Sequence, residues 1–178
     1  DIPLAMLGRF ALHQKNWQKA ADYYQRIISN GQYSLESSRA KALSSGSKEL
    51  LYALLSDDDI FAQTIEKNDV LPLITYTEIL LGLADAKSNL GEVSEAMQYI
   101  QLLCTARGIN TIPTPENHRN LLHTLWKTGL KGTGSYVDFL KRNNLAEETL
   151  GIESFRKLFP FPQREIDSNR NLKQNPGY

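Results

Sequence analysis

The stretch TYTEILLGLADAKSNLGEVSEAMQYIQLLCTARG, residues 75–108, has the pattern of two helices joined by a tight turn. Thr75 and Glu78 have the spacing of a capping box, in which each side chain can bond the other's backbone N–H. Gly91 and Gly108 follow the two apolar runs, and glycine is the residue that most often ends a helix. Because the turn is so short, the helices must lie antiparallel. We expect them at Thr75–Leu90 and Val93–Arg107.

A second stretch with the same pattern lies near the start of the chain, where we expect helices at Leu4–Lys15 and Trp17–Ser29. One shift of 76 residues relates Ala20 to Ala96 and Leu7 to Leu83. A small residue at the alanine position lets one helix approach the other closely, as in tetratricopeptide-like hairpins. Two unrelated hairpins remain the alternative, and two units are fewer than the roughly three repeats that a solenoid needs.

The 178 residues fit one mainly α-helical domain. We expect tetratricopeptide-like hairpins with an extended C-terminal strap. The expected segments of this domain are a first hairpin at 1–35, an irregular connector at 36–72 and a second hairpin at 73–108. Further helices and a loop follow at 109–157, and the tail is 158–178.

Three shorter segments in the connector and after the second hairpin carry their own signals. KELLYALL, residues 48–55, fits a strand or a buried helical turn, and periodicity does not decide between them. SDDDIFAQTIEKND, residues 56–69, has the pattern of a short capped helix. Thr114 is the expected cap of a helix that ends at Gly129, and a later helix is expected to break at Asn143–Asn144.

Composition excludes several classes of protein. Twenty basic residues balance twenty acidic ones. A nucleic-acid-binding protein usually carries a basic excess, and a polybasic membrane anchor needs one. With Cys104 as the one cysteine, no intrachain disulfide can form. No apolar run approaches the roughly 18 residues that span a bilayer.

The usual residue patterns of catalytic and metal sites are not found. His13, His118 and His123 lack the spacing of a helical zinc pair. The acidic run at residues 57–59 lacks the alternation and glycine of a calcium loop. The loop GLKGTGS, residues 129–135, lacks the ending of a phosphate-binding loop. We therefore expect no catalytic residue, no metal and no cofactor.

Aromatic side chains offer the remaining route to a binding site. Flat rings are the usual platforms for the apolar faces of sugars. Trp126 and Tyr136 flank the glycine-rich loop and are the expected ligand-binding residues. Packing in the core is the competing interpretation for both.

The tail LFPFPQREIDSNRNLKQNPGY, residues 158–178, resembles the ending of the SusD/RagB-like outer-membrane lipoproteins of Bacteroidetes. That family typically ends with a Pro-x-Pro stretch, an acidic and asparagine-containing middle, and a Gln-Asn-Pro-Gly-Tyr terminus. The stretches 15–35 and 71–91 are similar to family helices. Members are usually much longer, and their common E-G-x-R-x-x-D-L-x-R stretch is absent here, so no ligand residue carries over.

The resemblance implies a non-enzymatic, surface-exposed protein of the outer membrane that captures oligosaccharide for a SusC-like TonB-dependent transporter. It implies a lipid anchor outside this sequence. A tetratricopeptide-like interaction subunit of an outer-membrane assembly, with no sugar site of its own, is the alternative. The apolar residues of the tail favour a strap over the hairpins rather than a frayed end.

Overall fold

The computed structural model describes residues 1–55, 70–130 and 133–178. The chain forms two compact units, Asp1–Tyr136 and Val137–Tyr178, and each is described by itself. The short helix expected within residues 56–69 lies outside the described residues. The domain boundaries expected from the sequence stay predictions.

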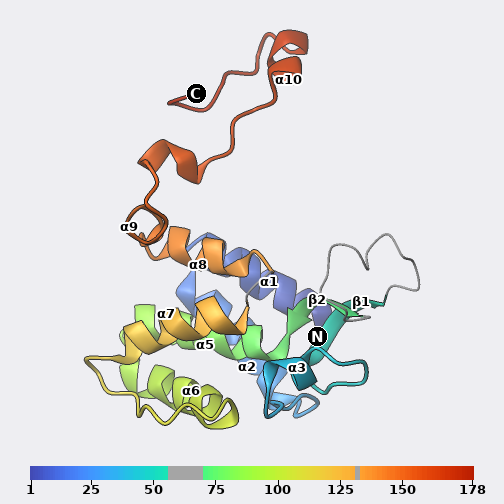
Figure 1. Ribbon diagram of the computed structural model, residues 1–178, viewed down its shortest axis with the longest axis vertical. Helices are drawn as coiled ribbons and strands as arrows, with labels where there is room; N and C mark the ends of the chain where they lie inside the picture. The colour runs from blue at the N-terminus through green and yellow to red at the C-terminus, as the bar shows by residue number, and fades with distance from the viewer. Residues whose placement is uncertain (56–69, 131–132) are drawn as a thin grey trace. The chain divides into compact units, whose positions relative to one another are not determined.

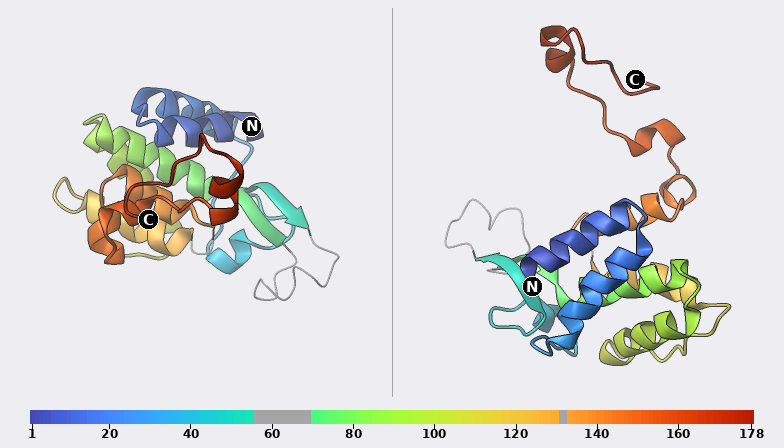
Figure 2. Two further views of the ribbon diagram at one scale, coloured as in Figure 1. Left: turned by 90° about the horizontal axis from the view of Figure 1, so that it is seen from above. Right: turned by 180° about the vertical axis from the view of Figure 1, so that it is seen from behind.

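The first unit is built on two antiparallel helical hairpins. The first consists of α1 (Ile2–His13) and α2 (Trp17–Ser29), and the second of α5 (Tyr76–Asn89) and α6 (Val93–Ala106). Helix α2 packs along α5, so the two hairpins lie side by side (Figures 1 and 2). The mainly α fold with tetratricopeptide-like hairpins is therefore confirmed, with helix ends within two residues of those expected.

The repeat between the hairpins extends to the backbone. Ala20 and Ala96 are both fully buried, as the close approach of the paired helices requires. Lys15 and Gly91, which the same shift relates, both have positive φ angles, of 56° and 83°. Each residue lies in the turn of its hairpin, so the two turns share one conformation despite their different side chains.

Tyr24 forms the centre of the contact between the hairpins. Its ring is buried, and it lies against Gly8 of α1 on one side and Gly82 of α5 on the other. A Cβ added at Gly8 would lie 2.4 Å from the Tyr24 ring, and one added at Gly82 would lie 2.5 Å from it. Only residues without a side chain leave room for this ring, so both glycines are explained by close approach.

The connector between the hairpins is more regular than the irregular segment expected at 36–72. It contains the short helix α3 (Arg39–Ala42), which Ser38 caps, and the strand β1 (Leu50–Leu55). Strand β1 pairs antiparallel with β2 (Val70–Thr75). The strand interpretation of residues 48–55 is therefore the correct one, because pairing with β2 supplies the ladder bonds that periodicity could not reveal.

Helix α7 (His118–Gly129) follows the second hairpin and packs on α5 and α6. The expectation that Thr114 caps this helix is wrong. Its hydroxyl accepts from the Asn117 N–H at 3.3 Å and so closes a turn, and the helix begins one residue after Asn117. The expected end at Gly129 is confirmed.

The second unit contains short elements. They are most of α8 (Ser135–Arg142), then α9 (Ala146–Leu150), a 3₁₀ turn (Ser154–Lys157) and α10 (Gln163–Ser168). The expected break at Asn143–Asn144 is confirmed, since Asn144 has a φ of 59°. The tail is extended except where α10 interrupts it (Figure 1). Its expected position over the hairpins stays a prediction.

Within the second unit the end of the tail binds back to its beginning. Gln174 bonds both backbone groups of Phe161, accepting from its N–H at 2.8 Å and donating to its carbonyl at 3.0 Å. The Asn175 amide donates to the Phe159 carbonyl at 2.6 Å, and the Tyr178 hydroxyl donates to the Leu158 carbonyl at 2.9 Å. We call these contacts of residues 174–178 with residues 158–161 the tail clasp.

Candidate ligand-binding site

The two aromatic residues predicted to bind ligand have different surroundings. Trp126, on the inner face of α7, is only 2% exposed, so its indole ring offers no free face. Tyr136, at the start of α8, is half-buried. Its ring lies nearly parallel to that of His123, with centroids 5.6 Å apart, and its hydroxyl lies 2.6 Å from His123 Nε2. The structure does not bring Trp126 and Tyr136 together as one exposed platform, and their contact with a ligand stays a prediction.

The pairing of His123 with Tyr136 has an electrostatic consequence. Burial lowers the pKa of His123, and the nearby Lys127 cation lowers it further. Burial also raises the pKa of Tyr136. Both side chains are therefore neutral near pH 7.

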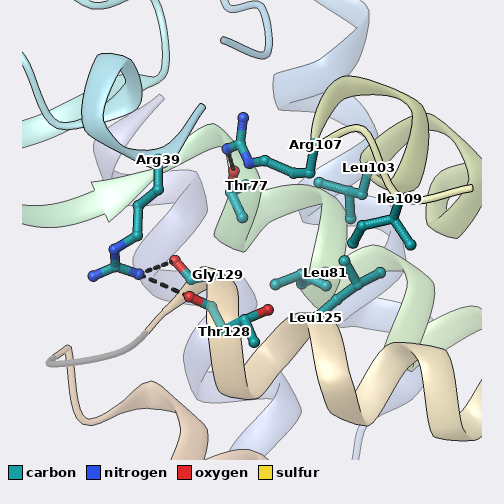
Figure 3. Close-up of a pocket in the computed structure, with 9 residues that line it drawn as sticks. All are labelled: Arg39, Thr77, Leu81, Leu103, Arg107, Ile109, Leu125, Thr128 and Gly129. Atoms are coloured by element: carbon teal, nitrogen blue, oxygen red, sulfur yellow. Dashed lines mark hydrogen bonds between the residues drawn. The ribbon is translucent and has the colours of Figure 1, made fainter. Parts of the chain in front are cut away.

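A pocket of about 190 Å³ opens where α5, α6 and α7 meet (Figure 3). Its apolar wall combines Leu81 of α5 with Leu103 of α6 and Leu125 of α7, all buried in the core. The remaining lining residues are Arg39, Thr77, Arg107, Ile109, Thr128 and Gly129. Arg39 closes one edge by donating from Nη1 to the Thr128 and Gly129 carbonyls at 3.1 and 2.7 Å.

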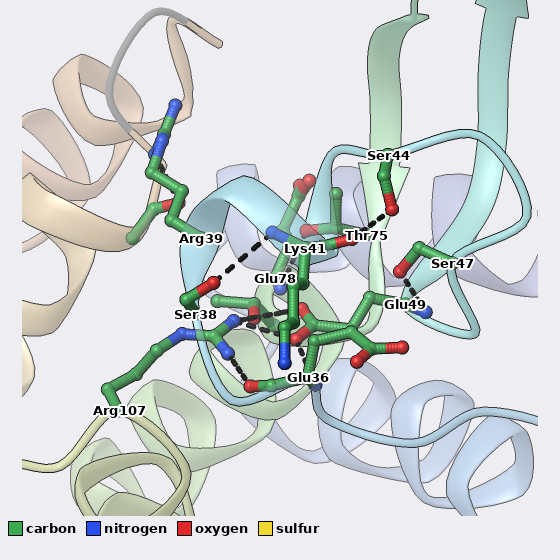
Figure 4. Close-up of polar contacts among 12 residues, drawn as sticks. Glu36, Ser38, Arg39, Lys41, Ser44, Ser47, Glu49, Thr75, Glu78 and Arg107 are labelled. Atoms are coloured by element: carbon green, nitrogen blue, oxygen red, sulfur yellow. Dashed lines mark hydrogen bonds and ion pairs between the residues drawn. The ribbon is translucent and has the colours of Figure 1, made fainter.

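An ionic cluster around the buried Glu49 shares Thr77 and Arg107 with the lining of the pocket (Figure 4). Glu49 is fully buried and accepts from Arg107 Nη2 with both carboxylate oxygens, at 2.8 and 3.0 Å. Glu49 also accepts from the Thr77 hydroxyl at 2.6 Å and from the Glu36 N–H at 2.6 Å. Arg107 donates in turn to the Glu36 carbonyl. The cluster thereby fixes the connector to the end of the second hairpin.

Sequence reasoning missed this cluster because Glu49 and Arg107 are 58 residues apart in the chain, and no local spacing reveals such a pair. It also missed the pairing of Arg9 with Glu78, whose atoms Nε and Oε1 lie 2.5 Å apart. The expected capping box is thus half formed. Thr75 accepts from the Glu78 N–H at 3.3 Å, while the Glu78 carboxylate binds Arg9 of the first hairpin.

One serine–histidine pair could suggest nucleophilic catalysis. Ser88 Oγ lies 3.0 Å from His118 Nε2, and both side chains are buried. His118 Nδ1 lies 2.8 Å from the Pro115 carbonyl, so a neutral acceptor rather than a carboxylate orients the ring. A buried pair oriented in this way ties α5 to the start of α7, and a substrate has no path to the hydroxyl.

The described residues offer no metal site, no membrane-spanning helix and no activated thiol. No group of three or more histidine, cysteine, aspartate or glutamate side chains there could hold a metal ion. Within the same residues, no helix is both long and apolar enough to span a bilayer. Cys104 is buried, and burial raises the pKa of its thiol, which disfavours the reactive thiolate.

Comparisons with known proteins place the fold. No family model matches the chain, and no curated protein matches it either. Among solved structures it is similar to a SusD superfamily protein from Bacteroides vulgatus, with a TM-score of 0.80 and 16% identity over 98% of this chain. A SusD superfamily protein from Bacteroides thetaiotaomicron aligns with a TM-score of 0.74 and 21% identity over 97% of this chain.

A third similar structure has a ligand. It is surface glycan-binding protein A from Bacteroides thetaiotaomicron in complex with laminarihexaose, with a TM-score of 0.78 and 15% identity over 97% of this chain. The chain therefore has the SusD-like fold, which confirms the fold implied by the tail. The chain spans only part of the length of these proteins. It covers 62% of the Bacteroides vulgatus protein, 62% of the glycan-binding protein in the laminarihexaose complex, and 59% of the SusD superfamily protein from Bacteroides thetaiotaomicron.

Proposed function

We propose that this protein is a non-enzymatic glycan-binding protein that captures oligosaccharide at the cell surface. The observation that carries the proposal is the fold shared with a surface glycan-binding protein in complex with laminarihexaose. The balanced charge of the chain also suits a neutral ligand such as a glycan.

The proposed partner is a SusC-like TonB-dependent transporter, to which the bound oligosaccharide would be passed. The proposed location is the outer face of the outer membrane, with a lipid anchor in a part of the protein outside this sequence. Both proposals rest on the resemblance of the tail and on the SusD-like fold. Co-purification of a transporter with the protein from membranes would support the partner.

Tyr136 is the proposed glycan contact within this chain, because it is the more accessible of the two aromatic residues predicted from the sequence. A tyrosine ring can stack on a sugar with little loss of side-chain entropy, since it has two rotatable bonds. Trp126 would contribute through packing below the surface, because its ring is buried. A single ring gives modest affinity, which binding alongside a transporter would raise.

The test is affinity electrophoresis of the purified chain through gels that contain different polysaccharides, with a laminarin gel included. We expect retardation in at least one gel, and Tyr136→Ala should reduce it. Tyr52→Ala is the matched control, because Tyr52 is an exposed tyrosine on β1. Trp126→Ala should cost about 3–5 kcal/mol of stability, so its binding is interpreted only alongside its circular dichroism spectrum.

Two results would count against this proposal in different ways. Unchanged retardation of Tyr136→Ala, with an intact fold, would exclude the proposed contact but not glycan binding. The absence of binding to any polysaccharide on a broad panel would exclude glycan binding by this chain.

The alternative is a protein-interaction subunit without a sugar site, and one surface feature favours it. On α1 the side chains of Met6, Leu7 and Phe10 lie on one face and are 60%, 45% and 61% exposed. Contiguous exposed apolar side chains often mark a protein contact. Glycan-independent capture of a membrane protein, lost in Phe10→Ser, would support this alternative.

A further inference from the structure

The pocket between α5, α6 and α7 differs in character from a sugar site. Its wall is aliphatic, formed by side chains from three helices that the hairpin packing brings together (Figure 3). None of the described residues that line it is aromatic. Sugars are commonly held by flat aromatic faces together with free hydrogen-bonding groups, and aliphatic walls favour another kind of ligand.

The polar side chains that line the pocket already have partners within the protein. Thr77 donates to Glu49 and accepts from Arg107 at 2.8 Å, and the Thr128 hydroxyl donates to the Thr124 carbonyl at 2.8 Å. Arg39 donates to the carbonyls at the end of α7. A ligand with many hydroxyl groups would bury some of them without partners, at a cost of about 1–3 kcal/mol each.

The charged groups at the pocket also have partners within the protein. Arg107 pairs with the Glu49 carboxylate, so its positive charge is neutralised within the protein. Arg39 lies against the carbonyl end of α7, where the helix dipole places partial negative charge. An anionic ligand would compete with these carbonyls for Arg39 and with Glu49 for Arg107, and a cationic ligand would meet two guanidinium groups.

The volume of the pocket sets the size of the ligand. About 190 Å³ compares with the roughly 150 Å³ of an engineered apolar cavity in another protein that binds benzene. Water in an aliphatic pocket finds few hydrogen-bond partners, and its displacement by an apolar group is favourable. The pocket thus has room for one ring or a short branched chain.

We propose that this pocket binds a small, uncharged, apolar molecule of about the size of benzene or indole. The ligand lies against Ile109 and Leu125, reaches the edges of the buried Leu81 and Leu103, and leaves the hydrogen bonds of Thr77 and Arg107 in place. This site is separate from the proposed glycan contact at Tyr136, and neither proposal depends on the other.

The experiment is a titration of the full chain with toluene and with indole, followed by the methyl signals of its leucines in NMR spectra. We expect saturable shifts at Leu81, Leu103 and Leu125. The control within the same spectrum is Leu102, which neighbours Leu103 on α6 and is exposed. Glucose at the same concentrations is the polar comparison and should leave the three pocket leucines unchanged.

A matched pair of variants tests the position of the site. Ile109→Trp adds bulk at the pocket lining and should weaken probe binding by about tenfold or more. Ile112→Trp makes the same change at a side chain that is mainly exposed and outside the lining, and it should bind as the parent does. If Ile109→Trp does not fold, Gly129→Ala replaces it, because the added Cβ would lie 3.3 Å from Thr77 Cγ2 and narrow the pocket.

The proposal is overturned by any of three results. The first is the absence of saturable shifts in the parent, and the second is equal shifts at Leu102 and the pocket leucines. The third is unchanged probe affinity in a folded variant that fills or narrows the pocket. None of these results bears on glycan binding at Tyr136.

Discussion

Tyr24 shows how one side chain can fix the distance between two helical hairpins. Its ring fills the space that Gly8 and Gly82 leave open, so α1 and α5 approach α2 from opposite sides of the same residue. Protein interiors are packed as densely as organic crystals, and a contact of this kind has no room for an added carbon.

We predict that Gly82→Ala destabilises the protein, because the new Cβ would overlap the Tyr24 ring and overpacking of this kind costs about 1–3 kcal/mol. The steric cost should outweigh the roughly 1 kcal/mol by which alanine favours a helix over glycine. Urea unfolding followed by circular dichroism measures the change.

Gly129→Ala is the control for this prediction. Its Cβ would lie 3.3 Å from the nearest atom, so any cost should be within about 1 kcal/mol. Equal stability of Gly82→Ala and the parent would show that the Tyr24 ring moves aside readily, and the proposed spacing role would be lost.

At this scale the sequence predicted backbone features better than side-chain environments. The 76-residue shift correctly paired Lys15 with Gly91 and Ala20 with Ala96, since a tight hairpin requires the same turn and the same close contact wherever it occurs. The match of Leu7 with Leu83 does not extend to burial, because Leu7 is 45% exposed and Leu83 is buried. Core packing was the competing interpretation for Trp126, and its exposure of 2% agrees with that interpretation. Local spacing left both interpretations open, because tertiary packing decides how deeply a residue next to a loop is buried.

At the scale of elements, the pair of Glu49 and Arg107 joins the connector to the end of α6. Removing one partner from a buried pair leaves the other charge without compensation, which typically costs about 3–5 kcal/mol. We predict a loss of this size for Glu49→Ala in urea unfolding. The double variant Glu49→Leu with Arg107→Met should be less destabilised than Glu49→Ala, since it leaves no buried charge behind.

The matched control is the exposed pair of Glu147 and Lys157, whose atoms lie 2.6 Å apart. An exposed pair contributes little after solvent screening, so Glu147→Ala should leave the urea midpoint close to that of the parent. If Glu49→Ala and Glu147→Ala lowered the free energy of unfolding equally, burial would not determine how much the Glu49 pair contributes to stability.

The tail clasp makes a second prediction about an element. Gln174 is the only described partner of the Phe161 N–H, so Gln174→Ala should expose this amide to exchange. Loss of one such bond, worth about 1 kcal/mol, corresponds to roughly fivefold faster hydrogen exchange at Phe161. Gln163→Ala is the control, because Gln163 bonds Asp167 within α10 and not the clasp. Unchanged exchange at Phe161 in Gln174→Ala would mean that the clasp does not form in solution.

At the scale of the whole molecule, the sequence predicted the two hairpins, the tail and the SusD-like fold. Their signals are local, in caps, turns and a terminal motif. The pairing of β1 with β2 and the buried cluster at Glu49 could not be predicted, because each depends on residues far apart in the chain. The pocket lay beyond sequence reasoning for the same reason, since three helices and the connector contribute to its lining.

The prediction that the tail acts as a strap is tested by truncation after Leu158. We expect a lower melting temperature, by several degrees, because each kcal/mol lost shifts the midpoint of a chain of this size by about 2–4 °C. The apolar residues removed include Phe159, Phe161, Ile166 and Leu172. Truncation after Lys173, which removes the clasp but keeps these side chains, should have the smaller effect. An unchanged melting temperature after the first truncation would show that the tail is not a strap.

The arrangement of Tyr24 between Gly8 and Gly82 also constrains how this sequence can change over evolutionary time. Either glycine can accept a side chain only after Tyr24 has become smaller, since the added carbon would otherwise overlap the ring. A smaller residue at position 24 first leaves a cavity, and later alanines at positions 8 and 82 refill it. The order of substitutions is therefore fixed by packing, and related sequences should show either tyrosine with two glycines or a small residue with alanines.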